Sequence, residues 1–167
     1  MTSRLIEFYL GNGTDFAGRR IADIWAMSFE ELEYNHDFIQ WLFPLRERSG
    51  AQPNSPVLDD ATIRAFEARD LRERLATSAD VMARFYGLEI ADGEVRRSPA
   101  FDERRTHWLT RGNHNFLRHT RIMKSLATLG HVELARAWQR ALIAIYDEHA
   151  SVIGSTTVGY WREAVSA

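Results

Sequence analysis

The sequence predicts an all-α protein, a single-domain irregular bundle of about six to seven helices around a central helix at residues 28–43. Three observations indicate this class. Apolar residues recur at the three- and four-residue spacing of amphipathic helices through most of the chain. Residues typical of helix starts and stops bracket those segments. Only residues 88–100 have the character of strands.

Length and composition bound the class of protein. The 167 residues suit one domain, and we treat residues 1–167 as that domain. A net charge of −2 gives no general attraction to nucleic acid or to an anionic membrane. The absence of cysteine excludes disulfides and cysteine metal ligands. No apolar run approaches the roughly 18 residues of a transmembrane helix, and the first residues do not resemble a signal peptide.

We therefore expect a cytoplasmic protein without a transmembrane segment. Arginine accounts for all but one of the 21 basic residues, the exception being Lys124. That bias is typical of a GC-rich genome and favours a bacterial source.

The chain begins with a short apolar stretch and a helix. Residues 6–10 are mostly apolar and end at Gly11-Asn12-Gly13, which indicates a turn. Thr14 or Asp15 is suited to cap the next helix, which we expect at about residues 15–27.

The central helix is expected at residues 28–43. Ser28 and Glu31 form a capping box at its start, and Pro44 cannot continue it. At about 100° per residue, its apolar side chains form two faces, so neighbours should pack on both sides. The first face has Phe29, Leu32, Ile39 and Phe43 with His36 in the middle, and the second has Tyr34, Phe38, Trp41, Leu42 and Leu45. The remaining stripe is mostly acidic and consists of Glu30, Glu33, Asp37 and Gln40.

A loop at residues 46–58 leads to a helix that Asp59 or Asp60 caps and that runs to Tyr86, with a break expected at Thr77-Ser78. Gly87 is expected just past its end, in the left-handed conformation. Asp92-Gly93 predicts a small β-hairpin near residues 89–96. Further helices are expected at about 101–111, at 114–129 between Asn113 and Gly130, at 132–150 and at 157–165.

The helix from His114 carries a second polar stripe, in which His114, Arg118, Arg121 and Ser125 fall within about 60° of one another. One interpretation is a solvated face, since charged residues are mostly exposed. Another is an anion site, because His114 and Asn115 lie at a helix N-terminus and the two arginines add donors. A third pairs this stripe with the acidic one, as a closed structural seam or as the lining of a pocket with Trp41 and Trp108 as walls.

These interpretations define the candidate ligand-binding residues: His36, Asp37, Gln40, Trp41, Trp108, His114, Asn115, Arg118 and Arg121. We expect no metal and no cofactor, because the six histidines lack tight ligand spacing and no phosphate-binding loop is present. We assign no catalytic residue. The concentrated basic pairs, Arg96-Arg97 and Arg104-Arg105, favour a solvated surface over nucleic-acid binding.

The run HDFIQWLFPL, residues 36–45, resembles the conserved region of the opioid growth factor receptor family. The likeness covers roughly residues 5–145. It also rests on Phe8, Tyr9, Gly11, Asp15, Gly18, Trp25, Leu32, Glu33, Pro56, residues 84–88, Trp108 and the helix at residues 114–130. Where the family usually has an isoleucine, this chain has His119.

The resemblance implies a domain that in animals belongs to a receptor for an enkephalin peptide, and it supplies no catalytic residues. Three hypotheses follow. The first is a binding module for a peptide, a protein or a small anionic ligand, and the second is an enzyme of unknown reaction that uses a buried His, Asp and Arg site. The third is a purely structural interaction domain. The sequence leaves the oligomeric state open.

Overall fold

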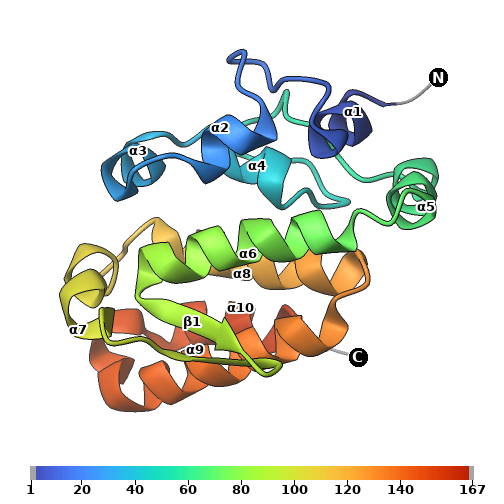
Figure 1. Cartoon of the computed structure of the whole chain (residues 1–167). Helices are drawn as coiled ribbons and strands as arrows, with labels where there is room; N and C mark the ends of the chain where they lie inside the picture. The colour runs from blue at the N-terminus through green and yellow to red at the C-terminus, as the bar shows by residue number, and fades with distance from the viewer. Residues whose placement is uncertain (1–2, 166–167) are drawn as a thin grey trace. The chain divides into compact units, whose positions relative to one another are not determined.

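The computed structural model describes residues 3–165 (Figure 1). Within that range the chain forms ten α-helices, one 3-10 helix and a two-stranded antiparallel sheet, so the predicted all-α class with a small hairpin is confirmed. The chain divides within helix α6 into two compact units, one through Ser78 and one from Ala79 onward. Each unit is described by itself.

Short helices make up the first unit. They are α1 (Arg4–Leu10), α2 (Ile21–Trp25), α3 (Phe29–Tyr34), α4 (Ile39–Leu42), α5 (Asp60–Ala68) and the start of α6 (Arg72–Tyr86). The predicted apolar stretch at residues 6–10 is helical. The side chain of Ser3 caps it by accepting a hydrogen bond from the Ile6 amide, and Gly11 ends it with a φ of +90°.

The predicted helix at residues 15–27 is wrong over its first part. The side chain of Asp15 accepts hydrogen bonds from the amides of Ala17 and Arg19, at 3.0 and 2.9 Å. Gly18 has a φ of +80°, which no right-handed helix contains. An aspartate that bonds its own neighbouring backbone competes with helix formation, so only Ile21–Trp25 is helical.

The single central helix at residues 28–43 is also wrong, although both of its ends are confirmed. Ser28 and Glu31 form the capping box, and the helical segment stops before Pro44. Between them the chain leaves the helix at Asn35, which is extended and whose side-chain amide donates to the carbonyl of Glu31 at 2.9 Å. Asparagine readily makes such bonds and thereby favours helix ends. The segment therefore consists of α3 and α4, joined by residues 35–38.

This break changes which side chains are buried. Phe29 and Tyr34 on α3 are exposed, against the expectation of two buried faces, and His36 is exposed in the connection. The run from Phe38 to Leu45 is buried instead.

The helix expected from residue 59 or 60 to Tyr86 is divided at residues 69–71 rather than at Thr77-Ser78. Asp59 caps α5 as predicted, and Asp70 adopts a left-handed φ of +51° between α5 and α6. Ser78 continues α6, and its buried hydroxyl accepts a hydrogen bond from the indole of Trp25 at 3.0 Å. The same hydroxyl lies 3.0 Å from that of Tyr9, and burial raises the pKa of Tyr9.

The second unit begins in α6 and contains a hairpin and the longer helices. Its elements are β1 (Leu88–Ala91), β2 (Glu94–Arg97), α7 (Phe101–Arg104), the 3-10 helix η1 (Arg105–His107), α8 (Asn115–Thr128), α9 (Val132–Ile153) and α10 (Ser155–Glu163). The predicted hairpin is confirmed, with Ile90 opposite Val95 and left-handed Asp92 and Gly93 at its turn. The helix expected at 101–111 is shorter, because it tightens into η1 after Arg104.

Helices α8, α9 and α10 pack against one another, and β2 packs on α9 (Figure 1). Buried tryptophans fill this unit, and each indole N–H has a partner. Trp161 donates to the carbonyl of Phe116 at 3.1 Å, and Trp108 donates to the carbonyl of Tyr86 at 3.0 Å. Since a buried indole N–H without a partner is costly, these bonds fix how the tryptophans pack.

Candidate functional site

The N-terminus of α8 is built from a tight polar turn. Helix α8 starts at Asn115 with His114 as its N-cap residue, one residue later than predicted, and the side-chain oxygen of Asn113 accepts a hydrogen bond from the Asn115 amide at 2.9 Å. The same oxygen accepts from the side-chain amide of Asn115 at 3.0 Å. The predicted anion site relied on free N–H groups at His114 and Asn115. At Asn115 that donor is already used within the protein.

Behind this turn lies a buried polar network. Asn115 is fully buried, and Arg118 is only 5% exposed. The side-chain oxygen of Asn115 accepts a hydrogen bond from the Tyr86 hydroxyl at 3.0 Å and from the Arg118 guanidinium at 3.4 Å. The interpretation of a solvated polar face is therefore wrong for Arg118. A guanidinium removed from water needs partners, so this network orders the start of α8.

His119 lies one residue further on, in an aromatic surround. Its ring centroid is 4.0 Å from that of Tyr86, 4.8 Å from Trp108, 5.8 Å from Trp161 and 6.0 Å from Trp138. Its Nδ1 accepts a hydrogen bond from the indole of Trp138 at 3.0 Å, so a neutral ring carries its proton on Nε2.

The surroundings of His119 disfavour a positive charge on its ring. Its Nε2 is buried and has no hydrogen-bond partner. Burial lowers the pKa of His119 to about 3. His119 is therefore a neutral core histidine in the place where the resemblance leads one to expect isoleucine, and it accepts a hydrogen bond that isoleucine could not accept. Trp108, predicted as a pocket wall, is fully buried in the same cluster.

A hollow of about 180 Å3 opens beside the start of α8. Its lining residues are Gly112, Asn113, His114, Phe116, Leu117, Thr120, Thr157 and Tyr160. Leu117 is 64% exposed and Tyr160 is 49% exposed, so two of the large apolar side chains that reach solvent lie at one hollow. Sequence reasoning identified His114 here but missed Leu117 and Tyr160. The helix wheel could have indicated that Leu117 is exposed, because it lies about 60° from His114, beside the polar stripe.

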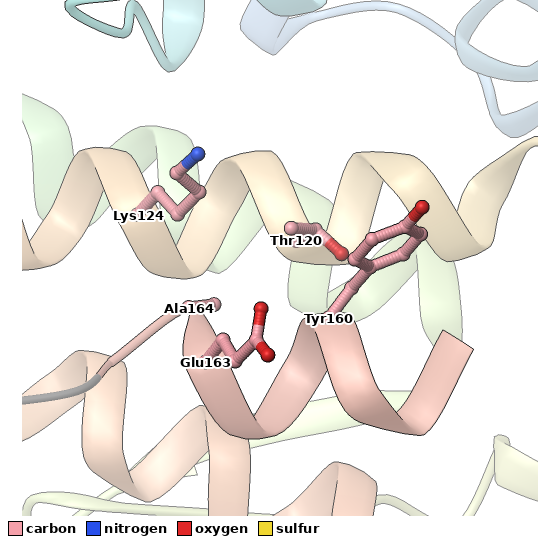
Figure 2. Close-up of a pocket in the computed structure, with 5 residues that line it drawn as sticks. All are labelled: Thr120, Lys124, Tyr160, Glu163 and Ala164. Atoms are coloured by element: carbon pink, nitrogen blue, oxygen red, sulfur yellow. The ribbon is translucent and has the colours of Figure 1, made fainter. Parts of the chain in front are cut away.

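A second hollow, of about 410 Å3, lies further along the same two helices (Figure 2). Thr120 and Lys124 line it from α8, and Tyr160, Glu163 and Ala164 line it from α10 and its end. Figure 2 shows the Tyr160 ring and the Thr120 side chain beside each other at one end of the hollow. These two residues also line the first hollow.

The remaining candidates belong to the first unit. Asp37 pairs with Arg19 at 2.8 Å, and Arg19 also contacts the buried carboxylate of Asp15 at 2.7 Å. Burial lowers the pKa of Arg19, but hydrogen bonds to the two carboxylates outweigh this and raise it overall. Asp37 thus ties the connection between α3 and α4 to the Asp15 turn.

Trp41 and Gln40 are both buried on α4. Trp41 packs edge-on against Phe8 and Phe16, with ring centroids at 5.2 and 5.0 Å. The side-chain amide of Gln40 donates to the carbonyl of His36 at 3.4 Å, while its Oε1 has no partner. Trp41 is therefore a core residue of the first unit.

The structure thus brings Asn115 and Arg118 together at the start of α8, with His114 beside them and Arg121 half-buried one turn further on. The predicted pairing of the acidic and basic stripes joins residues of different units and stays a prediction. Within residues 3–165 no group of three or more histidine, aspartate or glutamate side chains is placed to hold a metal ion. No helix in the same range is long and apolar enough to cross a membrane.

Comparison with known proteins decides the family. Residues 6–166 match the opioid growth factor receptor (OGFr) conserved region. The chain belongs to the OGFr conserved-region family. The expected resemblance is thereby confirmed, and it extends beyond residue 145.

Several vertebrate proteins of the family are similar to this chain. Opioid growth factor receptor-like protein 1 of Xenopus tropicalis is 40% identical over 114 residues, which cover 66% of this chain and 22% of that protein. The opioid growth factor receptor of Mus musculus is 42% identical over 110 residues, covering 64% and 17%. The human receptor is 38% identical over 110 residues, covering 64% and 16%.

This OGFr-family chain spans about a fifth of the length of the curated relatives that it matches. No solved structure matches it. The relatives named above are vertebrate proteins, so the bacterial source inferred from the arginine bias stays a prediction.

Proposed function

We propose that this OGFr-family domain is a binding module that recognises a peptide or another small ligand carrying an acidic group. The observation that carries the proposal is the first hollow, where the exposed Leu117 and Tyr160 lie next to Asn113 and His114. Binding sites commonly combine an apolar surface with a few polar groups that orient the ligand. The hollow has both.

Electrostatics support an acidic group in the ligand. The hollow lies at the N-terminal end of α8, where the helix dipole is positive. Arg118 lies one turn further along the helix, buried in the network of Asn115 and Tyr86, and does not line the hollow. A carboxylate near His114 is therefore favoured over an amine. Two of the relatives are named as receptors, which supports a binding role. We also propose that the protein is cytoplasmic.

The test is a selection of displayed 16-residue peptides on the immobilised full chain, followed by binding measurements with the enriched peptides. We expect Leu117→Glu to abolish their binding, because it places a carboxylate in the apolar part of the hollow. The fold should tolerate this change, since Leu117 is exposed and an acidic residue in the first turn of a helix is favourable. Val132→Glu on α9, which also changes an exposed apolar residue outside the hollow, is the matched control.

Two outcomes count against the proposal. One is that no peptide is enriched on the wild-type chain over the Leu117→Glu chain. The other is that enriched peptides bind equally well after every acidic residue in them is changed to its amide, which would remove the role assigned to the positive end of α8.

A further inference from the structure

The first hollow has the size of one side chain rather than of a whole ligand. Its volume is about 180 Å3. Sites that enclose a complete small molecule usually measure about 300–1,000 Å3, whereas a cavity of about 150 Å3 with an apolar lining is enough to hold benzene. The hollow therefore suits a single ring-sized group, and the rest of the ligand lies outside it.

Aromatic side chains form much of the lining. Phe116 is buried, and its ring packs edge-on against that of Trp161 with the centroids 5.9 Å apart. Tyr160 and Leu117 also line the hollow, and both are exposed. Contacts between aromatic rings are more favourable than the buried area alone accounts for. An aromatic ring in the hollow is therefore favoured over an aliphatic group of similar size.

Contacts between α8 and α10 hold the lining in place. The indole of Trp161 on α10 donates a hydrogen bond to the carbonyl of Phe116 on α8 at 3.1 Å. Phe116 and Thr120 are four residues apart on α8, and Thr157 and Tyr160 are three residues apart on α10, so each helix contributes neighbouring side chains of one face. A lining that is already ordered lowers the entropic cost of binding.

Two threonine hydroxyls line the hollow beside the aromatic rings. The Thr120 hydroxyl donates to the carbonyl of Phe116 at 3.3 Å, so its proton is already used. Thr157 is half-buried, and among residues 3–165 its hydroxyl has no hydrogen-bond partner. A hydroxyl group on a bound ring can donate to it or accept from it.

From this we infer that the first hollow is an anchor pocket for one aromatic ring of the ligand, and that Thr157 favours a ring that carries a hydroxyl group. The acidic group of the ligand lies beside the ring, near His114. The inference rests on the proposed function and specifies the chemistry of its ligand, an aryl group with a carboxylate close to it.

The test uses small molecules, so it does not depend on finding a peptide. Phenylacetate, 4-hydroxyphenylacetate and cyclohexylacetate are each titrated against the full chain, and NMR follows the methyl signals of Leu117. We expect phenylacetate to bind with a Kd of about 1 mM, which is ordinary for a ligand of about ten non-hydrogen atoms. Cyclohexylacetate should bind about fivefold more weakly, because it lacks the aromatic contacts.

The role of Thr157 is tested with a change that keeps the shape of the side chain. The wild type should bind 4-hydroxyphenylacetate about fivefold more tightly than phenylacetate, and Thr157→Val should bind the two alike. Thr156→Val, the same change at an exposed position of α10 outside the hollow, is the matched control and should keep the preference.

The outcomes separate this inference from the proposed function. The aromatic anchor is overturned if phenylacetate binds no better than cyclohexylacetate, or if neither aromatic acid shifts the Leu117 signals at millimolar concentration. A preference for the hydroxyl group that survives in Thr157→Val would overturn the role of that residue. Enriched peptides that depend on Leu117 but contain no aromatic residue would keep the binding module and contradict the anchor.

Discussion

Replacing His119 with glutamine should remove a pH-dependent part of the free energy of unfolding. In the folded protein the ring is buried among aromatic side chains, and its pKa is lowered to about 3. In the unfolded chain a histidine has a pKa of about 6.5. Between these two pKa values the unfolded state is protonated at His119 and the folded state is not. The free energy of unfolding therefore keeps this contribution above pH 6.5 and loses it as the pH falls toward 3.

The magnitude follows from these two pKa values. Between pH 7 and pH 5, protonation of His119 in the unfolded state alone should lower the free energy of unfolding by about 2 kcal/mol. For a protein of this size, that corresponds to a melting temperature about 4–8 °C lower. Glutamine does not titrate, and its carbonyl oxygen is a possible acceptor for the indole of Trp138.

The assay is urea unfolding of the wild type and His119→Gln at pH 7, 6 and 5. Carboxylates titrate alike in both proteins, so the difference between the two isolates His119. We expect the wild type to lose about 2 kcal/mol more than the variant over this range. Parallel loss in both proteins would refute the buried neutral histidine, as would an imidazole signal of folded His119 that shifts between pH 8 and 5.

Three further predictions concern stability. Trp41→Ala should cost about 3–5 kcal/mol, because the side chain is only 2% exposed; urea unfolding measures this, and a loss below about 1 kcal/mol would mean an exposed indole. Arg19→Ala should cost about 1–3 kcal/mol by leaving the buried carboxylate of Asp15 without its ion-pair partner, and Asp15→Asn in the same background should recover part of that loss. Gly87→Ala should lower the melting temperature more than Gly93→Ala. Both positions have a left-handed φ, which costs an alanine about 1–2 kcal/mol, but only at Gly87 would the added carbon lie 2.7 Å from the backbone of α7. Equal losses in thermal unfolding would contradict this.

Local chemistry explains which elements the sequence predicted correctly. The capping box of Ser28 and Glu31, the cap at Asp59 and the turn at Asp92-Gly93 each depend on residues within a few positions of one another. The start of α8 also depends on a local bond, from the Asn115 amide to the side chain of Asn113, and it lies within one residue of the predicted start. Competing local bonds explain two of the errors. Asp15 bonds nearby backbone and keeps residues 15–20 out of the predicted helix, and Asn35 bonds the carbonyl of Glu31 at the point where α3 ends.

The candidate site was predicted only in part, for a similar reason. The helix wheel placed His114 and Arg118 on one stripe, but it carries no information about what lies opposite that stripe. Arg118 is buried because Asn115 and Tyr86, the latter 32 positions earlier in the chain, form a network with it. Leu117 lines the hollow together with Tyr160, which lies on α10 and is distant in the sequence.

The sequence by itself therefore determined the all-α class, the hairpin, the family and the helix starts at Ser28 and Asp59, because each depends on spacing or on neighbouring residues. Only the tertiary structure decided that Trp41 is buried, because Phe8 and Phe16, which pack against it, come from distant parts of the chain. It also decided that His119 is neutral, because the aromatic rings that exclude water from it come from four separate segments of the chain. Burial and charge depend on such distant partners, which no local pattern specifies.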